Sequence, residues 1–147
     1  MWILGGHTHD VSGHLLDTSE FLHADGTVSA GPNLLIAMSG HCAVQLINSD
    51  GTFGNVLYMG GNSGASRKKV NLYDTSTGTI SEDHSTMLFE HSLFSCTIFY
   101  SPKHEGRPVV FAGPGEYSDN QAELLDYTMT TTWEARKYSY YIDKMFS

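Results

Sequence analysis

The chain alternates short apolar runs with stretches of Gly, Asn, Asp, Ser and Thr, and its fifteen glycines are scattered throughout. Short apolar runs bounded by turn-forming residues are typical of β-strands, whereas helices need longer periodic segments. We therefore predict an all-β protein. The apolar runs are Trp2–Leu4, Leu15–Leu16, Ala43–Ile47, Val56–Met59, Val70–Tyr73, Thr97–Tyr100, Val109–Ala112 and Leu124–Tyr127.

The spacing of the runs indicates an internal repeat. Three apolar runs lead into glycine, and the glycines that follow them, Gly5, Gly60 and Gly113, are 55 and 53 residues apart. Glycine at a strand end permits positive φ and close backbone approach. Similarity at a fixed period is the mark of repeat architectures. We therefore expect a unit of a little over fifty residues.

Two further landmarks recur in the same register. A strand followed by a turn occupies residues 20–28, 72–80 and 124–133, with copies 52 residues apart. The segment Gly40–Val44 returns as Phe94–Ile98 after 54 residues. Three recurring landmarks, two of them present in three copies, form a specific signal.

These residues resemble the Kelch repeat, in which an apolar strand ends in Gly-Gly, a Tyr-Asp strand and turn leads to Trp, and a Gly-Pro segment precedes a His-Cys strand. Residues 31–42 are the best single match, and the resemblance covers residues 1 to about 135. The copies depart from the pattern in places. Only the third has the tryptophan, Trp133, and Ser85-Thr86 stand where the first has Gly31-Pro32.

The resemblance implies antiparallel four-stranded blades of a Kelch-type β-propeller, arranged around a channel. We expect one domain, residues 1–147, with about three blades and eleven strands in all. The expected parts are a partial blade at 1–32, a second blade at about 37–85, a third at about 90–136 and a C-terminal strand or tail at 137–147.

Three blades are too few for a closed ring, because propellers have about four to eight. Either the chain is a segment of a longer polypeptide, or several copies assemble into a ring or a filament. The C-terminal stretch has strand composition and could supply the strand that the first blade lacks, or it could be a loosely docked tail. Its candidate assembly residues are Tyr138, Tyr140, Tyr141 and Ile142.

Charge and cysteine content exclude several classes of partner and scaffold. The formal net charge of -8 disfavours nucleic acid and anionic lipid surfaces. No apolar run approaches the roughly twenty residues of a membrane span. The two cysteines, Cys42 and Cys96, stand at equivalent positions of neighbouring blades, which we expect to lie beyond the roughly 7 Å limit for a disulfide. Free thiols would slightly favour the cytoplasm and leave an extracellular location open.

Few residues suggest chemistry. His7, His9 and Asp10, followed by His14, are candidate transition-metal ligands, although a solvated loop is the favoured interpretation. His41 is expected to serve packing. No nucleophile elbow, phosphate-binding loop or His-Glu-x-x-His motif occurs, so we assign no catalytic residue and no cofactor.

Three functions are compatible with this sequence, because a fold does not fix a function. The leading hypothesis is a protein-interaction scaffold that binds a partner through the loops after the glycine-ended strands. The alternatives are a structural protein that assembles through open blade faces and an enzyme resembling the copper-containing galactose oxidases, whose Tyr and His ligands we match to no residue here. The candidate binding residues are His7, His9, Arg67, Lys68, Glu116, Tyr117 and Asp119.

Overall fold

In the residues that it describes, the computed structural model contains three antiparallel β-sheets and one short 3-10 helix, η1 (Pro102–His104). It describes the chain except for residues 10–12, 49, 64–66, 119–120, 128–131 and 138–147. The strands in chain order are β1 (Trp2–Leu4), β2 (Ser19–Leu22), β3 (Val28–Ala30), β4 (Cys42–Ile47), β5 (Phe53–Met59), β6 (Lys69–Asp74), β7 (Thr79–Thr86), β8 (Cys96–Ser101), β9 (Arg107–Ala112), β10 (Gln121–Leu125) and β11 (Glu134–Lys137).

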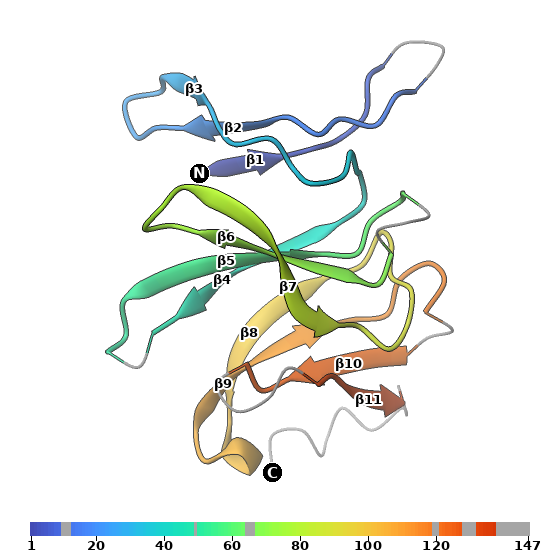
Figure 1. Ribbon diagram of the computed structural model, residues 1–147. Coiled ribbons are helices and arrows are strands. Elements are labelled where there is room, and N and C mark those ends of the chain that lie inside the picture. Colours follow the sequence, from blue (N-terminus) through green and yellow to red (C-terminus); the bar gives the residue numbers. More distant parts are fainter. Residues whose placement is uncertain (10–12, 49, 64–66, 119–120, 128–131, 138–147) are drawn as a thin grey trace.

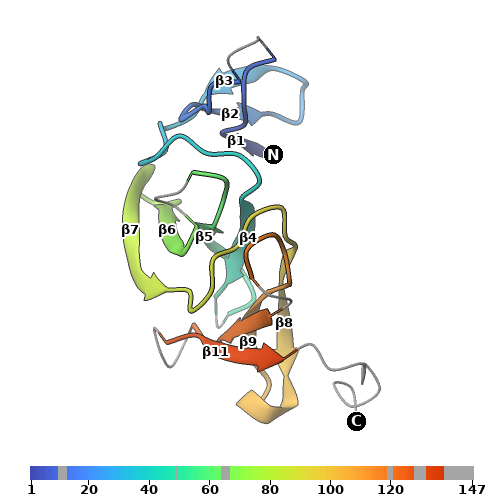
Figure 2. The ribbon, with the colours of Figure 1, turned by 90° about the vertical axis from the view of Figure 1, so that its right-hand side faces the viewer.

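Each sheet is built from strands that are consecutive in the sequence. The first sheet has the order β1-β2-β3, the second β4-β5-β6-β7, and the third β11-β10-β9-β8. The sheets are stacked in chain order, as Figures 1 and 2 show. The all-β, antiparallel prediction is confirmed.

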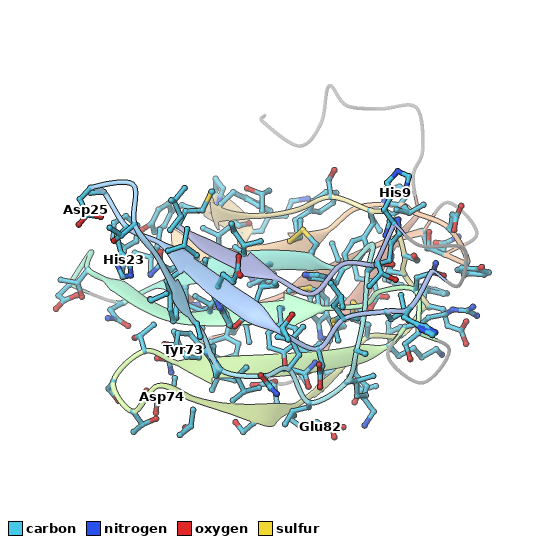
Figure 3. All side chains as sticks on the ribbon, turned by 90° about the horizontal axis from the view of Figure 1, so that it is seen from above. His9, His23, Asp25, Tyr73, Asp74 and Glu82 are labelled. Carbon is cyan, nitrogen blue, oxygen red and sulfur yellow. A yellow bond between two sulfur atoms is a disulfide. The ribbon has the colours of Figure 1, made fainter. Side chains whose placement is uncertain are left out.

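Aspartates shape three of the tight turns that make neighbouring strands antiparallel. At β2–β3, β4–β5 and β6–β7, an aspartate carboxylate accepts a hydrogen bond from the backbone N–H two residues later, at 2.9 Å for Asp25, 2.9 Å for Asp50 and 2.8 Å for Asp74. Side-chain and backbone hydrogen bonds from that residue lower the pKa of each carboxyl. We call this end of the sheets the hairpin end; Figure 3 shows it opposite His9.

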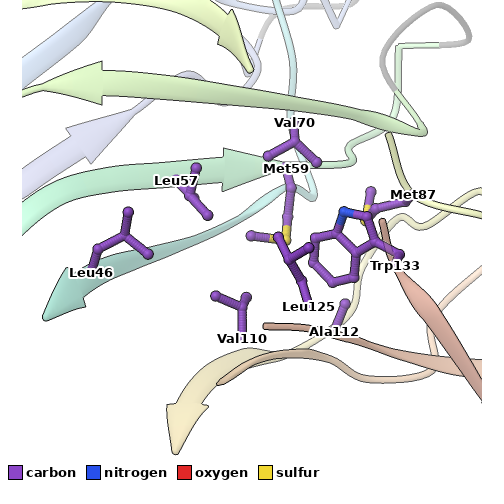
Figure 4. Close-up of a cluster of buried hydrophobic side chains, with 9 residues drawn as sticks. All are labelled: Leu46, Leu57, Met59, Val70, Met87, Val110, Ala112, Leu125 and Trp133. Carbon is purple, nitrogen blue, oxygen red and sulfur yellow. The ribbon is translucent and has the colours of Figure 1, made fainter. Parts of the chain in front are cut away.

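The main hydrophobic core lies between the second and third sheets (Figure 4). Leu57 and Val110 from the two sheets are fully buried, and Trp133 is 2% exposed. Burial of each such side chain contributes about 1.5–3 kcal/mol. The core therefore holds these two sheets together. Its buried members are Leu46, Leu57, Met59, Val70, Met87, Val110, Ala112, Leu125 and Trp133.

Aromatic rings join the first sheet to the second. Trp2 lies 4.4 Å from Tyr73 and 6.0 Å from Phe21 between ring centroids, and Tyr58 meets Trp2 edge-on at 6.2 Å. Such arrangements are favourable for aromatic pairs. These rings therefore pack between the first and second sheets.

A disulfide joins Cys42 to Cys96, and the prediction of free thiols was wrong. These residues begin β4 and β8, the first strands of successive sheets, and the strands converge there to a Cα separation of 5.9 Å. That distance is within the range that a disulfide spans. The argument for a cytoplasmic location thus loses its support.

Some of the residues singled out in the sequence are not described by the structure. The candidate assembly residues Tyr138, Tyr140, Tyr141 and Ile142 lie outside the described residues, as do Asp10 and Asp119. Among the described ranges, no helix is long and apolar enough to cross a membrane.

Candidate interaction surface

The loops after β1, β5 and β9 lie at what we call the glycine end, because glycines finish these strands. At the end of β5, Gly60 and Gly61 have φ of +67° and +116°, values that glycine adopts without steric cost. The Gly61 N–H donates to the His91 carbonyl at 2.9 Å. A Cβ on Gly60 would lie 2.7 Å from the same carbonyl oxygen. The glycines therefore let the chain segment between β7 and β8 pass directly beneath the loop.

The same backbone arrangement occurs one repeat earlier. Gly5 and Gly6 have φ of +49° and +118°, and the Gly6 N–H donates to the Met38 carbonyl at 2.7 Å. A Cβ on Gly5 would approach that carbonyl to 2.5 Å. The recurrence of Gly-Gly in the sequence thus has a physical cause, which is the close passage of the following connection.

The loop after β9 packs on the other side of the connection between β7 and β8. Ser92 and Glu116 exchange two backbone hydrogen bonds of 2.8 and 3.2 Å as an isolated antiparallel bridge. A Cβ on Gly115 would lie 2.5 Å from the Ser92 carbonyl and 2.6 Å from Phe94. Ser118 closes the loop, since its hydroxyl lies 2.9 Å from the Gly115 nitrogen.

A buried carboxylate fixes the connection from below. Glu123 on β10 accepts hydrogen bonds from the backbone N–H of Leu88 at 2.7 Å and of Phe89 at 2.8 Å. Its other partner is His91 Nε2 at 2.9 Å, and both side chains are fully buried. Buried charges require such partners. The connection is therefore a rigid base for the two loops that contact it.

Two of the predicted binding residues meet on this base. The Arg67 guanidinium lies over the Tyr117 ring, 3.8 Å from its centroid. Arg67 Nη1 also pairs with Glu90 at 3.2 Å, and the Arg67 carbonyl accepts from the His91 N–H at 3.0 Å. Tyr117 remains 52% exposed. The cation–π contact holds the Tyr117 ring in place, and the ring stays accessible to solvent.

The two lysines that follow Arg67 have polar partners within the chain. Lys68 Nζ donates to the Leu88 carbonyl at 2.8 Å, and Lys69 Nζ pairs with Glu82 at 2.8 Å. These lysines hold the loop in place and do not form an open basic patch.

The histidine cluster after β1 does not form a metal site in the described part of the chain. His7 pairs with Leu15 through the backbone, and the His14 N–H donates to the Thr8 hydroxyl at 3.0 Å. No group of three or more His, Cys, Asp and Glu side chains in the described ranges is placed to hold a metal. No described contact joins His7 or His9 to Arg67 or Tyr117.

His41 lies beside the second loop. A Cβ on Gly61 would meet the His41 Cβ at 3.4 Å, and burial lowers the pKa of the His41 imidazole. This half-buried position favours the packing role that the sequence predicts.

Sequence reasoning missed the contribution of the connection itself. Leu93 is 66% exposed, and Glu90 balances Arg67. In the structure, Leu93 stands two residues after the His91 carbonyl that Gly61 binds, as Gly40 stands two residues after the Met38 carbonyl that Gly6 binds. No sequence signal singled out Leu93, because the register of the repeat pairs Gly40 with Phe94.

Comparison with known proteins gives a likeness of fold. No protein-family model matches the chain, and no curated protein matches its sequence. Among solved structures, a fungal alcohol oxidase of the AA5 family in complex with copper aligns with a TM-score of 0.61 and 18% sequence identity. The fold resembles part of that oxidase. The alignment covers 91% of this chain and 27% of the oxidase, so the chain spans about a quarter of that protein's length.

Proposed function

We propose that the chain is a three-blade segment of a Kelch-type β-propeller that serves as a protein-interaction scaffold through its glycine end. The repeat landmarks, the sheets of consecutive antiparallel strands and the likeness in fold to part of a larger solved structure support the blade assignment. Loops on a rigid scaffold are the usual place for binding residues.

The observation that carries the proposal is the contact between Arg67 and Tyr117. The two residues come from separate loops, yet the guanidinium is held 3.8 Å from the ring centroid while the ring stays 52% exposed. Tyr and Arg are the residue types enriched at the energetic centres of protein interfaces. Because Arg67 is fixed by Glu90, little side-chain entropy remains to be lost on binding.

An affinity-capture comparison tests this function. The 147-residue chain serves as bait in an extract of cells that express it, in parallel with a variant carrying Arg67→Ala and Tyr117→Gly. Glycine is chosen because Tyr117 has a φ of +68°. We expect partners retained by the parent chain to be lost by the variant.

The matched control is Phe53→Ala, because Phe53 is 76% exposed but lies beside the β4–β5 hairpin at the opposite end. Partners lost by the loop variant and retained by the control support the proposal. Retention of every partner by the loop variant would exclude the glycine end as the binding surface.

Self-assembly is a second candidate, and the first sheet favours it. Its outward side chains Ile3 and Val28 are 43% and 56% exposed. β1 is an edge strand of this sheet. The backbone of Met1 hydrogen-bonds to Leu22 and that of Gly5 to Thr18, on the side that faces β2. Because backbone groups alternate in direction along a strand, those of Trp2 and Leu4 point to the open edge. An open edge beside apolar surface favours association.

The native mass of the purified chain separates this candidate from the first. Assembly predicts a mass that is a multiple of 16.2 kDa, and the paired variant Ile3→Lys with Val28→Lys should reduce it to a monomer. A parent chain that is monomeric at all concentrations tested excludes assembly and leaves the scaffold proposal intact.

A further inference from the structure

Leu93 is held in a conformation that normally belongs to glycine. Its φ is +50°, and Gly40, which occupies the equivalent place in the structure two residues after the carbonyl that the preceding Gly-Gly pair binds, has a φ of +64°. The Leu93 N–H donates to the Gly40 carbonyl at 2.8 Å, so the surrounding structure fixes this conformation. Burial does not explain the leucine, because its side chain is 66% exposed.

Tyr117 shows the same combination of features. Its φ is +68°, and the ring is 52% exposed. A side chain in this backbone region costs conformational free energy that glycine avoids, and such outliers cluster at functional sites. Among the described residues other than glycine, only Leu93, Glu105 and Tyr117 have positive φ.

Leu93 and Tyr117 stand on two backbone segments that an antiparallel bridge joins. Each directly follows a residue of the bridge between Ser92 and Glu116, whose hydrogen bonds are 2.8 and 3.2 Å. Gly115 allows the two segments to approach each other closely, because a Cβ at this position would lie 2.6 Å from the Phe94 Cβ. We call Leu93 and Tyr117 the anchor pair.

Glu116 supplies a negative charge next to Tyr117. Glu90 is balanced by Arg67 at 3.2 Å. Glu116 is exposed, and no ion pair or side-chain hydrogen bond engages its carboxylate within the described part of the chain. The chain as a whole carries -8, which attracts cationic partners over longer distances.

We infer that the anchor pair binds a protein segment in which an apolar side chain stands next to a lysine or arginine. The apolar side chain packs on Leu93 and the Tyr117 ring, and the cation meets Glu116. This inference rests on the proposed function, since it specifies the partner of the same surface.

Peptide display tests the inference. Random peptides on phage are selected on the immobilised 147-residue chain, and the enriched peptides are synthesised for affinity measurements. We expect an aliphatic or aromatic residue within two positions of Lys or Arg. Leu93→Gly should weaken these peptides about tenfold or more. Glu116→Gln should weaken them about threefold to tenfold, with less effect at high salt.

The variants separate binding from folding. Leu93→Gly removes the side chain from a backbone conformation that glycine prefers, so its thermal midpoint should equal or exceed that of the parent chain. Phe53→Ala removes an apolar side chain of comparable exposure at the hairpin end and should leave peptide affinity unchanged. A weaker peptide complex with a stable Leu93→Gly chain therefore reports the contact itself.

The outcomes distinguish this inference from the proposed function. Peptides that depend on Arg67 and Tyr117 but are acidic, or are insensitive to Leu93→Gly, overturn the inference and leave the scaffold in place. Peptides that are insensitive to all of these variants, or the absence of any enriched peptide, count against both. Competition by a second copy of the chain in place of peptide would favour self-assembly instead.

Discussion

The Glu123 carboxylate and the His91 imidazole form a pair, 2.9 Å apart, in which neither side chain has any exposed surface. The same carboxylate accepts two backbone hydrogen bonds from Leu88 and Phe89. One side chain of the third sheet therefore fixes the connection that supports the interaction surface. Its removal should affect both stability and binding.

Glu123→Gln is expected to lower the free energy of unfolding by about 2–4 kcal/mol, because an amide presents one acceptor oxygen where the carboxylate presents two. Urea denaturation measures the change. Glu105→Gln is the control, since Glu105 is 83% exposed and its pairing with Arg107 contributes at most about 1 kcal/mol. Equal effects of the two substitutions would contradict the role assigned to Glu123.

The disulfide between Cys42 and Cys96 closes a loop of 54 residues. In the chain-entropy account, a cross-link over this length stabilises the folded state by about 4 kcal/mol. Reduction should therefore lower the denaturation midpoint, whereas the double variant Cys42→Ser with Cys96→Ser should not respond to reductant. Thiol titration of the folded, unreduced protein is expected to find no thiol, and two titratable thiols would refute the bridge.

The sequence predicted most of the fold because the signals for it are local. Apolar runs bounded by turn residues located the strands, and the period of the Gly-Gly landmarks separated the three sheets. The disulfide was not predictable in this way. Whether Cys42 and Cys96 meet depends on how steeply β4 and β8 converge, which is a property of packing between sheets.

The candidate surface was predicted in part for a similar reason. Arg67 and Tyr117 stand on loops after glycine-ended strands, so their positions followed from the repeat. Leu93 lies on the connection between β7 and β8, for which the sequence predicts no more than a link between two strands. Its placement depends on the buried Glu123, and nothing in the local sequence of Leu93 indicates a carboxylate from 30 residues later in the chain.

Tyr58 should make stability depend on pH in the alkaline range. Burial raises the pKa of its phenol to about 12 from the ordinary value of 10.0, so the folded state disfavours the phenolate. Below pH 10 this contribution to stability is fully present, and it is lost as the pH rises through about 12 because the unfolded chain ionises first.

Tyr58→Phe removes the titrating group. The unfolding free energy of the parent chain should therefore fall by about 2–3 kcal/mol more than that of the variant as the pH rises from 10 to about 12. Denaturation at several pH values for both chains provides the measurement. The difference between the two curves isolates Tyr58 from the other tyrosines and the lysines. A difference that stays constant from neutral pH to pH 12 would show that burial does not shift this pKa.

Gly60 and Gly78 permit a direct test of the packing beneath the interaction surface. Both have positive φ, +67° and +71°, so alanine at either position carries the same backbone cost of about 1–2 kcal/mol. Only Gly60 approaches other atoms, since its Cβ would lie 2.7 Å from the His91 carbonyl and from the Phe94 ring, while nothing lies within 4 Å at Gly78. Gly60→Ala should therefore cost about 1–3 kcal/mol more than Gly78→Ala.

The same two variants test whether the packing supports binding. Because the added methyl group displaces the connection, Gly60→Ala should also lower the affinity for peptides selected on the anchor pair, whereas Gly78→Ala should not. Equal losses of stability with unchanged peptide binding would mean that the connection yields to the methyl group without moving Leu93 or Tyr117.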